Sequence, residues 1–395
     1  MSSKPSVLMV VPQYPYPIVG GLEKQSHELA KALIAQDVAV QVLSGKIFQD
    51  QADMEVVEGV PVFRLAWPTA KFARFLLVPA SLARMFWRLR RSFDVVHLHQ
   101  HSWVGLFVIV VAKVLGKPIL TKLPNVGDLG LPGMRRQSFG WLRLAILLQS
   151  DAIVAMSAES LRELMNFGYP RERVLLTPNG IPLSVPPAPK QSGASDVVAC
   201  RVVFLGRLIE QKQVDLLLRA WARVCTEGAL GSTLSICGDG PLASALKQQC
   251  DDLGIAGNVV FAGEVEGAKD RLAEMDIFVL PSQAEGNSNA ILEAMMAGLP
   301  IVSTPVGGTP MLLGDVGRAF LFPVDGAHQL SALLLSLIEN RRLRIAQGLA
   351  MRHRVEQNFD IMHVAKTYVQ CYGFLGTRQR VRVCEVSNPA VLDGQ

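Results

Sequence analysis

Short runs of β-branched and aliphatic residues alternate with longer stretches of helical spacing along almost the whole chain. This alternation is typical of parallel sheets whose strands are joined by crossover helices. Six runs in the first half are predicted strands: 7–11, 38–43, 95–98, 118–121, 152–155 and 174–177. Between them, residues 21–35 and 157–167 have the apolar spacing of helices with one buried face. The pattern therefore predicts an α/β fold.

A stretch rich in proline, serine, alanine and glycine, residues 182–195, interrupts this alternation. A second strand and helix series follows, with predicted strands at 202–205, 234–236, 259–261, 277–280 and 301–303. Since one core usually serves roughly 100–200 residues, 395 residues indicate two domains. We expect two Rossmann-like parallel-sheet domains facing each other across a cleft. Their predicted bounds are 1–184, a linker at 185–196, 197–352, a helix at 353–376 that returns to the first domain, and a tail at 377–395.

The composition excludes several classes of protein. Half of the residues are hydrophobic and 18% are charged, which indicates a globular chain. The apolar run at 103–112 stops at Lys113, short of the roughly 20 residues that cross a bilayer. Residues 7–11 fit a buried strand better than a signal peptide, so we expect a cytoplasmic protein. The six cysteines form no C-x-x-C pair, which argues against a zinc site or a disulfide framework.

The net charge of +5 comes from the first half of the chain, and much of it from residues 71–91. No acid lies between Glu58 and Asp94, and apolar residues are interleaved with six cations: Lys71, Arg74, Arg84, Arg88, Arg90 and Arg91. Such a stretch fits a helix resting on anionic lipid at the inner face of the membrane. It fits equally a core-packed helix with a basic solvated face. Nucleic acid is not an expected partner, because no recognition motif accompanies the charge.

The most informative stretch is residues 276–308, DIFVLPSQAEGNSNAILEAMMAGLPIVSTPVGG. A predicted strand ends at Leu280, and a helix begins near Ser288 or Asn289, either of which can cap it. The helix is expected to stop at Gly298. The loop between strand and helix lies where open α/β sheets bind ligands, at a helix N-terminus that favours anions and hydroxyls. Its candidate site residues are Glu285, Gly286, Asn287 and Ser288.

Glu285 and Glu293 are eight residues apart, which corresponds to about 12 Å of rise along a helix. Glycosidase carboxylates flank one bond at roughly 5–9.5 Å. The wider spacing suits the two ends of an extended ligand such as a sugar nucleotide. The alternative is two solvated helix residues of no special role.

Two cations, Arg207 and Lys212, follow a predicted strand of the same sheet. Cleaving a sugar–phosphate bond leaves about two negative charges on the diphosphate, and fixed cations and amides can meet them. The chain has no D-x-D motif, so we expect neither a metal nor an organic cofactor. Two glycine loops could add backbone amides for a phosphate, Gly20–Gly21 before a helix and Gly238 after a strand. Plain turns are the alternative for both.

Together these residues resemble the retaining GT-B glycosyltransferases of family 4, also called glycosyl transferases group 1, over about residues 5–375. The most specific motif is EGNSNAILE at 285–293 with its downstream GLPIVSTPVGG. The others are the GG loop, DVVHLH at 94–99, PNGI at 178–181, GRL with Lys212, and GDG at 238–240.

The resemblance implies transfer of a sugar from a nucleotide-diphosphate sugar to a glycan or lipid-linked acceptor, with retention and without a metal. The product would belong to polysaccharide or glycolipid biosynthesis. It implies that Arg207 and Lys212 bind the diphosphate and that Glu293 holds the ribose. It also implies that Glu285 with 286–288 contacts the sugar and phosphates, and that the loop at Glu264–Val265 lies against the base. An inactive nucleotide-binding protein and a nucleotide-sugar epimerase of this fold are the alternatives.

Two features depart from the family pattern or complicate it. Where many members have T-x-H, this chain has TKLP at 121–124, so Lys122 or Asn125 could substitute for the histidine. His97, His99 and His101 alternate along a strand end and so share one face. With no carboxylate or cysteine beside them, we prefer a catalytic position for His99 near the acceptor over a metal cluster.

Overall fold

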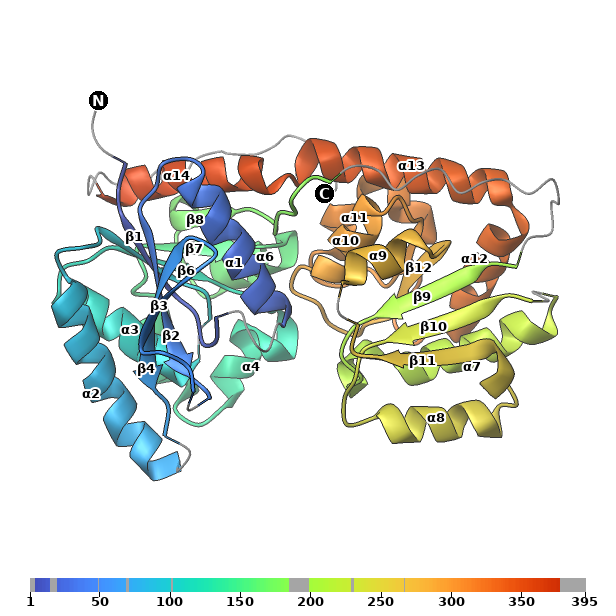
Figure 1. The fold of residues 1–395 in the computed structure, drawn as a ribbon, viewed down its shortest axis with the longest axis horizontal. Coiled ribbons are helices and arrows are strands. Elements are labelled where there is room, and N and C mark those ends of the chain that lie inside the picture. The colour runs from blue at the N-terminus through green and yellow to red at the C-terminus, as the bar shows by residue number, and fades with distance from the viewer. Residues whose placement is uncertain are drawn as a thin grey trace. The chain divides into compact units, whose positions relative to one another are not determined.

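The computed structural model describes residues 4–14, 20–48, 50–68, 71–100, 102–184, 199–228, 231–265 and 267–376. Its described residues form two compact units (Figure 1). Unit 1 contains the chain up to Pro182 together with the helix that starts at Ile361, and unit 2 contains Leu183 to Asp360. The predicted linker at 185–196 and tail at 377–395 lie outside the described residues.

The sheet of unit 1 has eight strands in the order β3-β4-β2-β1-β5-β6-β7-β8. Neighbouring strands are parallel, except that β3 runs antiparallel to β4. The strands are β1 (Val7–Val10), β2 (Val40–Lys46), β3 (Met54–Val57), β4 (Val60–Ala66), β5 (Val95–Leu98), β6 (Ile119–Lys122), β7 (Ala152–Ala155) and β8 (Val174–Leu176). The six predicted strands are confirmed, whereas the β3–β4 hairpin was missed.

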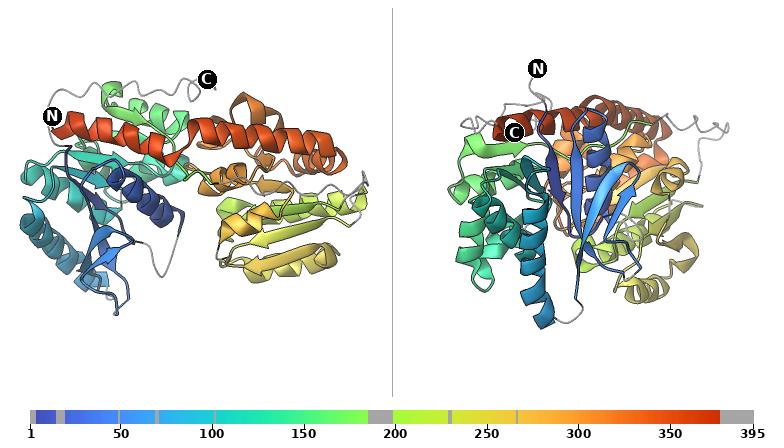
Figure 2. Two further views of the ribbon diagram at one scale, coloured as in Figure 1. Left: turned by 45° about the horizontal axis from the view of Figure 1, so that its top comes forward. Right: turned by 60° about the vertical axis from the view of Figure 1, so that its left-hand side comes forward.

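Helices cover both faces of this sheet (Figure 2). Successive residues of β1 point to opposite faces, so Val7 and Met9 join one core cluster and Leu8 and Val10 the other. The helices are α1 (Gly21–Ile34), α2 (Lys71–Leu89), α3 (Trp103–Val114), α4 (Leu131–Arg136), α5 (Gly140–Leu147) and α6 (Ala158–Asn166), with 3₁₀ turns at Gly127–Leu129 and Arg171–Arg173.

The single closing helix predicted at 353–376 is wrong in its extent. The chain forms α13 (Arg341–Asn358) in unit 2 and α14 (Ile361–Gly376) in unit 1. The helix is interrupted because the Ile361 amide donates to the Ile181 carbonyl at 3.0 Å instead of continuing the ladder. Gly180 permits this contact, since an added Cβ would lie 2.7 Å from the Ile361 Cα.

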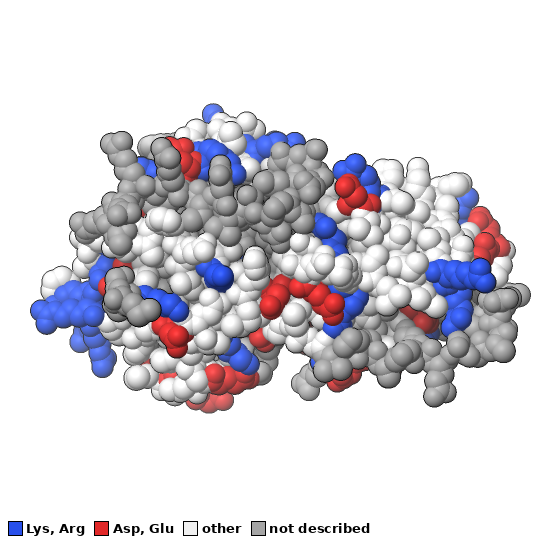
Figure 3. Space-filling model, turned by 90° about the horizontal axis from the view of Figure 1, so that it is seen from above, with Lys and Arg blue, Asp and Glu red and all other residues white. Residues whose placement is uncertain are grey.

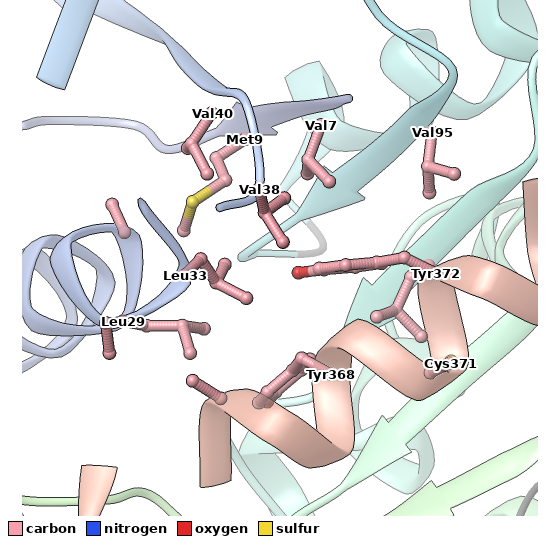
Figure 4. Close-up of a cluster of buried hydrophobic side chains, with 14 of the residues drawn as sticks. Val7, Met9, Leu29, Leu33, Val38, Val40, Val95, Tyr368, Cys371 and Tyr372 are labelled. Carbon is pink, nitrogen blue, oxygen red and sulfur yellow. The ribbon is translucent and has the colours of Figure 1, made fainter. Parts of the chain in front are cut away.

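Helix α14 completes the core of unit 1. Figure 4 shows Tyr368 and Tyr372 directed toward side chains of the sheet and of α1, and Cys371 belongs to the same buried cluster. The two tyrosines are 1% and 0% exposed, as fully buried as the strand residues they pack on. The burial of these two aromatic side chains stabilises unit 1, so α14 is part of its hydrophobic core.

The sheet of unit 2 has five parallel strands in the order β11-β10-β9-β12-β13. They are β9 (Arg201–Leu205), β10 (Thr233–Cys237), β11 (Val259–Gly263), β12 (Ile277–Leu280) and β13 (Ile301–Ser303), and all five were predicted. The remaining helices are α7 (Val214–Thr226), α8 (Ala243–Asp252), α9 (Ala268–Ala273), α10 (Asn289–Met296), α11 (Thr309–Gly317) and α12 (Ala327–Glu339), with 3₁₀ turns at Glu210–Lys212, Ala256–Asn258 and Arg318–Phe320. Two parallel-sheet α/β units are therefore confirmed.

Among the described helices, none combines the length and the apolar composition needed to cross a bilayer. On the face seen in Figure 3, lysine and arginine form small groups interspersed with acidic residues rather than one continuous basic surface.

Candidate functional site

The switch point of unit 2 lies between β9 and β12. β9 pairs with β10 on one side and with β12 on the other. The loops that follow β9 and β12 are therefore neighbours at the carboxyl edge of the sheet. Open α/β sheets bind ligands at this edge. The two loops carry Arg207 and Lys212 after β9, and Glu285 to Ser288 after β12.

An ion pair joins these two loops. The Lys212 Nζ donates to the Glu285 Oε1 at 2.5 Å, and the Ser282 Oγ donates to the same oxygen at 2.7 Å. The side chains of Lys212 and Glu285 are only 17% and 9% exposed. The structure therefore brings two predicted site residues into direct contact in a largely buried place, whereas Arg207 is exposed.

Hydrogen bonds to backbone groups also join the loop after β9 to the loop after β12. The Gln211 Nε2 donates to the Ala284 carbonyl at 2.6 Å, and the Gln283 amide donates to the Gln211 carbonyl at 2.8 Å. Gly238 has φ of 136°, and a Cβ there would lie 2.0 Å from the Gly206 carbonyl oxygen. Only glycine can close the turn after β10 this tightly against the loop after β9.

Helix α10 begins where the sequence predicts. Ser288 is its N-cap, and the Ser288 Oγ accepts from the Ile291 amide at 3.4 Å. Glu285 lies in the loop before the helix, so the rise of about 12 Å to Glu293 assumed from helical geometry does not apply. Residues 285–288 are buried and Glu293 is half-buried on the helix. The positive end of the helix dipole lies at this buried loop.

Two glycines after β13 contact the loop that carries Glu285. The sequence alone did not indicate a role for them. Gly307 has φ of 55°, and an added Cβ would lie 1.7 Å from the Glu285 carbonyl oxygen. The Gly308 amide donates to the Gly286 carbonyl at 2.8 Å. Ser282, the second donor to Glu285, was also missed. The only feature of the sequence that could have indicated Ser282 is its position three residues before Glu285.

The remaining residues predicted to bind the donor lie at loops of both units. In unit 2, Val265 is half-buried just after β11. In unit 1, Gly20 is the N-cap of α1 and Gly21 its first residue. Burial raises the pKa of the nearby Glu23 carboxyl, while the amides of Gly20 and Glu23 act in the opposite direction by hydrogen bonding to it. A carboxyl group thus already faces the start of α1.

His99 lies in a closed environment in unit 1. It is 1% exposed, and its ring centroid is 4.1 Å from that of His97 at the end of β5. The Nδ1 of His97 is 2.7 Å from the Tyr372 hydroxyl, and in the described part of the chain neither Nε2 atom has a hydrogen-bond partner. Burial lowers the pKa of both imidazoles, which favours their neutral forms. His101 lies outside the described residues.

Lys122, which stands near the position of the usual family histidine, is a buried amine at the end of β6. It is 4% exposed, and its Nζ donates to the Asn179 Oδ1 at 2.7 Å. Burial lowers its pKa from 10.5 to about 7. Asn179 belongs to the PNGI motif. The sequence singled out both residues, but not that they form a pair.

Comparison with known protein families covers most of the chain. Residues 19–185 match the model "Glycosyltransferase Family 4", and residues 199–340 match the model "Glycosyl transferases group 1". The chain is 25% identical over 291 residues to the N-acetyl-alpha-D-glucosaminyl L-malate synthase of Bacillus anthracis, which covers 72% of this chain and 75% of the relative. It is 26% identical to the glycogen synthase of Mycobacterium tuberculosis over 93% of this chain and 94% of that enzyme.

Solved structures share the fold. A sucrose-phosphate synthase from Thermosynechococcus elongatus superposes with a TM-score of 0.79 at 18% identity, covering 95% of this chain and all of that one. HepE from Anabaena, solved in complex with UDP and glucose, superposes with a TM-score of 0.74 at 17% identity, covering 93% of this chain and 99% of that one. Both of these structures have the two-domain GT-B fold.

Proposed function

The chain belongs to glycosyltransferase family 4, also called glycosyl transferases group 1, and is a glycosyltransferase; on this premise we propose that it transfers a sugar from a nucleotide-diphosphate sugar to a glycan or lipid-linked acceptor. The observation that carries the donor proposal is the ion pair of Lys212 and Glu285 at the switch point of unit 2. The complex of Anabaena HepE with UDP and glucose supports it by similarity of fold.

The pair suits a site that must accept and release a diphosphate. A nearly buried ammonium without an anion would be costly, and Glu285 supplies that anion when no donor is bound. A diphosphate carries more charge than one carboxylate and can take over the ammonium. Glu285 is then available for the hydroxyls of the sugar, to which a carboxylate is a strong acceptor.

We propose that transfer proceeds with retention and needs neither metal nor cofactor. The leaving diphosphate is stabilised by Lys212, by the exposed Arg207 and by the N-terminus of α10. Glu293, Gly238 and Val265 contribute to the nucleotide side, and Gly20 and Gly21 remain candidates for backbone contact to the donor. Unit 1 binds the acceptor, with His99 and Lys122 at the ends of β5 and β6.

A cytoplasmic location with peripheral membrane contact is part of the proposal. The solvent-facing side of α2 presents Leu77 and Trp87, 54% and 59% exposed, beside Arg84 and Arg88. The Arg90 guanidinium lies 4.0 Å from the centroid of the Trp87 ring. Exposed apolar side chains among arginines suit an anionic lipid surface. Flotation with anionic liposomes tests this proposal. If the R84S/R88S variant floats as well as the unmodified protein, the exposed side of α2 is only a solvated helix face.

The test of the donor proposal is product formation. The protein is incubated with UDP-, GDP- and ADP-sugars and acceptor extracts, and released nucleoside diphosphate is measured. We expect release with one donor class, and a loss of at least about 100-fold in Lys212→Met and Glu285→Gln. Arg219→Met, which breaks an exposed ion pair with Asp215 in the same unit, is the matched control. Turnover unchanged in Lys212→Met contradicts the proposal, and sugar conversion without acceptor indicates an epimerase.

A further inference from the structure

Two residues of unit 2 with an unfavourable backbone conformation hydrogen-bond to each other beside the candidate donor site. Among the described residues, five that are not glycine have a positive φ, and Gln213 (46°) and Asp325 (68°) are two of them. The Gln213 Nε2 donates to the Asp325 Oδ1. A left-handed conformation is unfavourable for a residue with a Cβ, and it persists where the surrounding contacts fix it. The bond between these two side chains is such a contact.

Gln213 directly follows Lys212 and separates two elements of the chain. The 3₁₀ turn Glu210–Lys212 ends at it, and α7 begins after it. Its amide donates to the Glu210 carbonyl at 3.0 Å, and its carbonyl accepts from the Leu217 amide at 3.2 Å. The φ and ψ of this one residue therefore set the angle between the turn and the helix. Because the turn carries Lys212, they also set where the Lys212 side chain lies relative to the rest of unit 2.

A glycine would adopt this backbone conformation without steric cost, so the presence of a glutamine requires another reason. Gln213 is only 5% exposed, and its Oε1 is buried without a hydrogen-bond partner among the residues that the structure describes. Because an ionised carboxylate only accepts hydrogen bonds, the amide turns its Nε2 toward Asp325. The side chain of Gln213 thus makes its bond to Asp325 even though its own carbonyl is left unpaired.

Asp325 lies at the start of a second helix. It directly precedes Gly326, the N-cap of α12, and its carbonyl accepts from the Ala327 amide at 3.0 Å. Helix α12 packs against α7 in the same unit. The bond between Gln213 and Asp325 therefore joins the starts of two helices that already contact each other.

Lys212 is held through both of its neighbours in the chain. Gln211 bonds to the loop after β12, Lys212 to Glu285, and Gln213 to Asp325. Three consecutive side chains thus make three separate contacts. The ammonium has a defined position before any donor binds, and a charge that is already in place need not be ordered during binding.

We propose that Gln213 is a positioning residue of the donor site: its hydrogen bond to Asp325 holds the backbone after Lys212 in the left-handed conformation and so places the ammonium for the diphosphate. The proposal rests on the donor function proposed above and deepens it. The whole effect of Gln213 on diphosphate binding runs through Lys212, so it disappears when the lysine is removed.

Glycine variants remove the hydrogen bond without adding strain, because glycine tolerates both values of φ. The probes are UDP, GDP and ADP, with binding to the full chain measured by calorimetry. In Q213G and in D325G, we expect the nucleotide that binds the unmodified protein to bind about 3- to 10-fold more weakly, the equivalent of one hydrogen bond. D325N keeps an acceptor and should retain the affinity. In a K212M background, D325G should have no further effect.

Acetylation of lysines reports the position of Lys212 without any nucleotide. The full chain is treated with acetic anhydride, and the reaction at each lysine is followed by peptide mass spectrometry. Lys212 should react at least about 3-fold faster in Q213G and D325G than in the unmodified protein and D325N, because the lost hydrogen bond raises the population in which the ammonium is accessible. Lys247, an exposed lysine on α8, should react at the same rate in all of them.

The matched control is D37G, since Asp37 in unit 1 also has a positive φ, 59°. It should change neither nucleotide affinity nor the acetylation of Lys212. Equal acetylation of Lys212 in D325G and the unmodified protein overturns the proposal, as does a loss of affinity in D325G that persists in the K212M background. Unchanged affinity in both glycine variants, with weakened binding in K212M, also overturns it and leaves the donor proposal intact. If acetylation changes as expected but no nucleotide binds the unmodified protein, the donor proposal fails and the positioning of Lys212 by Gln213 stands.

Discussion

The Nζ of Lys212 lies 2.5 Å from Oε1 of Glu285, although the two residues are 73 positions apart in the chain. Lys212 follows the first strand of unit 2 and Glu285 follows the fourth. They meet because parallel strands of a doubly wound sheet end at one edge, and because β9 and β12 are neighbours there. The contact is the basis for the first prediction.

Removing one member of this pair should destabilise unit 2 when no donor is bound. Glu285→Gln leaves the Lys212 ammonium largely buried beside a neutral amide, and we expect a loss of about 1–3 kcal/mol in the free energy of unfolding. Arg219→Met, at an exposed pair, should cost less than about 0.5 kcal/mol. Urea unfolding measures both. Equal, small effects would show that the Lys212–Glu285 contact contributes nothing.

Gly307→Ala should disturb the loop that carries Glu285. The new Cβ would lie 1.7 Å from the Glu285 carbonyl oxygen, and the positive φ of Gly307 adds strain. We expect a loss of at least about 2 kcal/mol in stability together with a loss of activity. Gly257→Ala in the same unit is the control, since a Cβ added there would have no atom within 4 Å. Thermal unfolding that is the same for both variants would argue against the close approach.

The two buried tyrosines of α14 allow a matched comparison. Tyr372→Phe removes the partner of the His97 Nδ1 and leaves a buried polar atom unpaired, which should cost about 1–3 kcal/mol. The Tyr368 hydroxyl is buried and has no hydrogen-bond partner among the described residues, so Tyr368→Phe should be neutral or slightly stabilising. Chemical denaturation distinguishes them. A larger loss in Tyr368→Phe than in Tyr372→Phe would contradict this assignment.

The stability of unit 1 should depend on pH through Lys122. Burial lowers the folded-state pKa from 10.5 to about 7, so between these values the unfolded chain binds more protons than the folded one. Stability therefore rises with pH across this window, by up to about 1.4 kcal/mol per pH unit, and the full penalty is present below about pH 7.

Lys122→Met should flatten this dependence, whereas Lys366→Met, an exposed lysine of the same unit, should leave it intact. Unfolding free energies measured from pH 6 to 10 provide the comparison. A Lys122→Met profile as steep as that of the unmodified protein would mean that the amine is charged and solvated in the folded state.

The central strands could be predicted because they are buried on both faces and read as uninterrupted apolar runs. The β3–β4 hairpin could not, since Glu55, Glu58 and Pro61 make this segment resemble a solvated loop. In the fold, Arg64 of β4 is buried and forms an ion pair with Glu55 of β3. The division between α13 and α14 was missed for a similar reason. The interruption depends on a long-range hydrogen bond to Ile181 that no local pattern reveals.

The candidate site shows the same limit. Strand ends and helix caps are local features, so the sequence located Arg207, Lys212 and Glu285 correctly at the edge of one sheet. Partnerships are not local. The pairing of Lys122 with Asn179, the second donor Ser282 and the support from Gly307 each join segments that only the folded chain brings together.

The central claim is that Lys212 holds the diphosphate of the donor. The most direct test is the dissociation constant of UDP, GDP and ADP for the unmodified protein, Lys212→Met and Arg219→Met, measured by calorimetry. We predict that one nucleotide binds, that Lys212→Met weakens it at least about 10-fold, and that Arg219→Met binds it as the unmodified protein does. An unchanged dissociation constant in Lys212→Met would contradict the account.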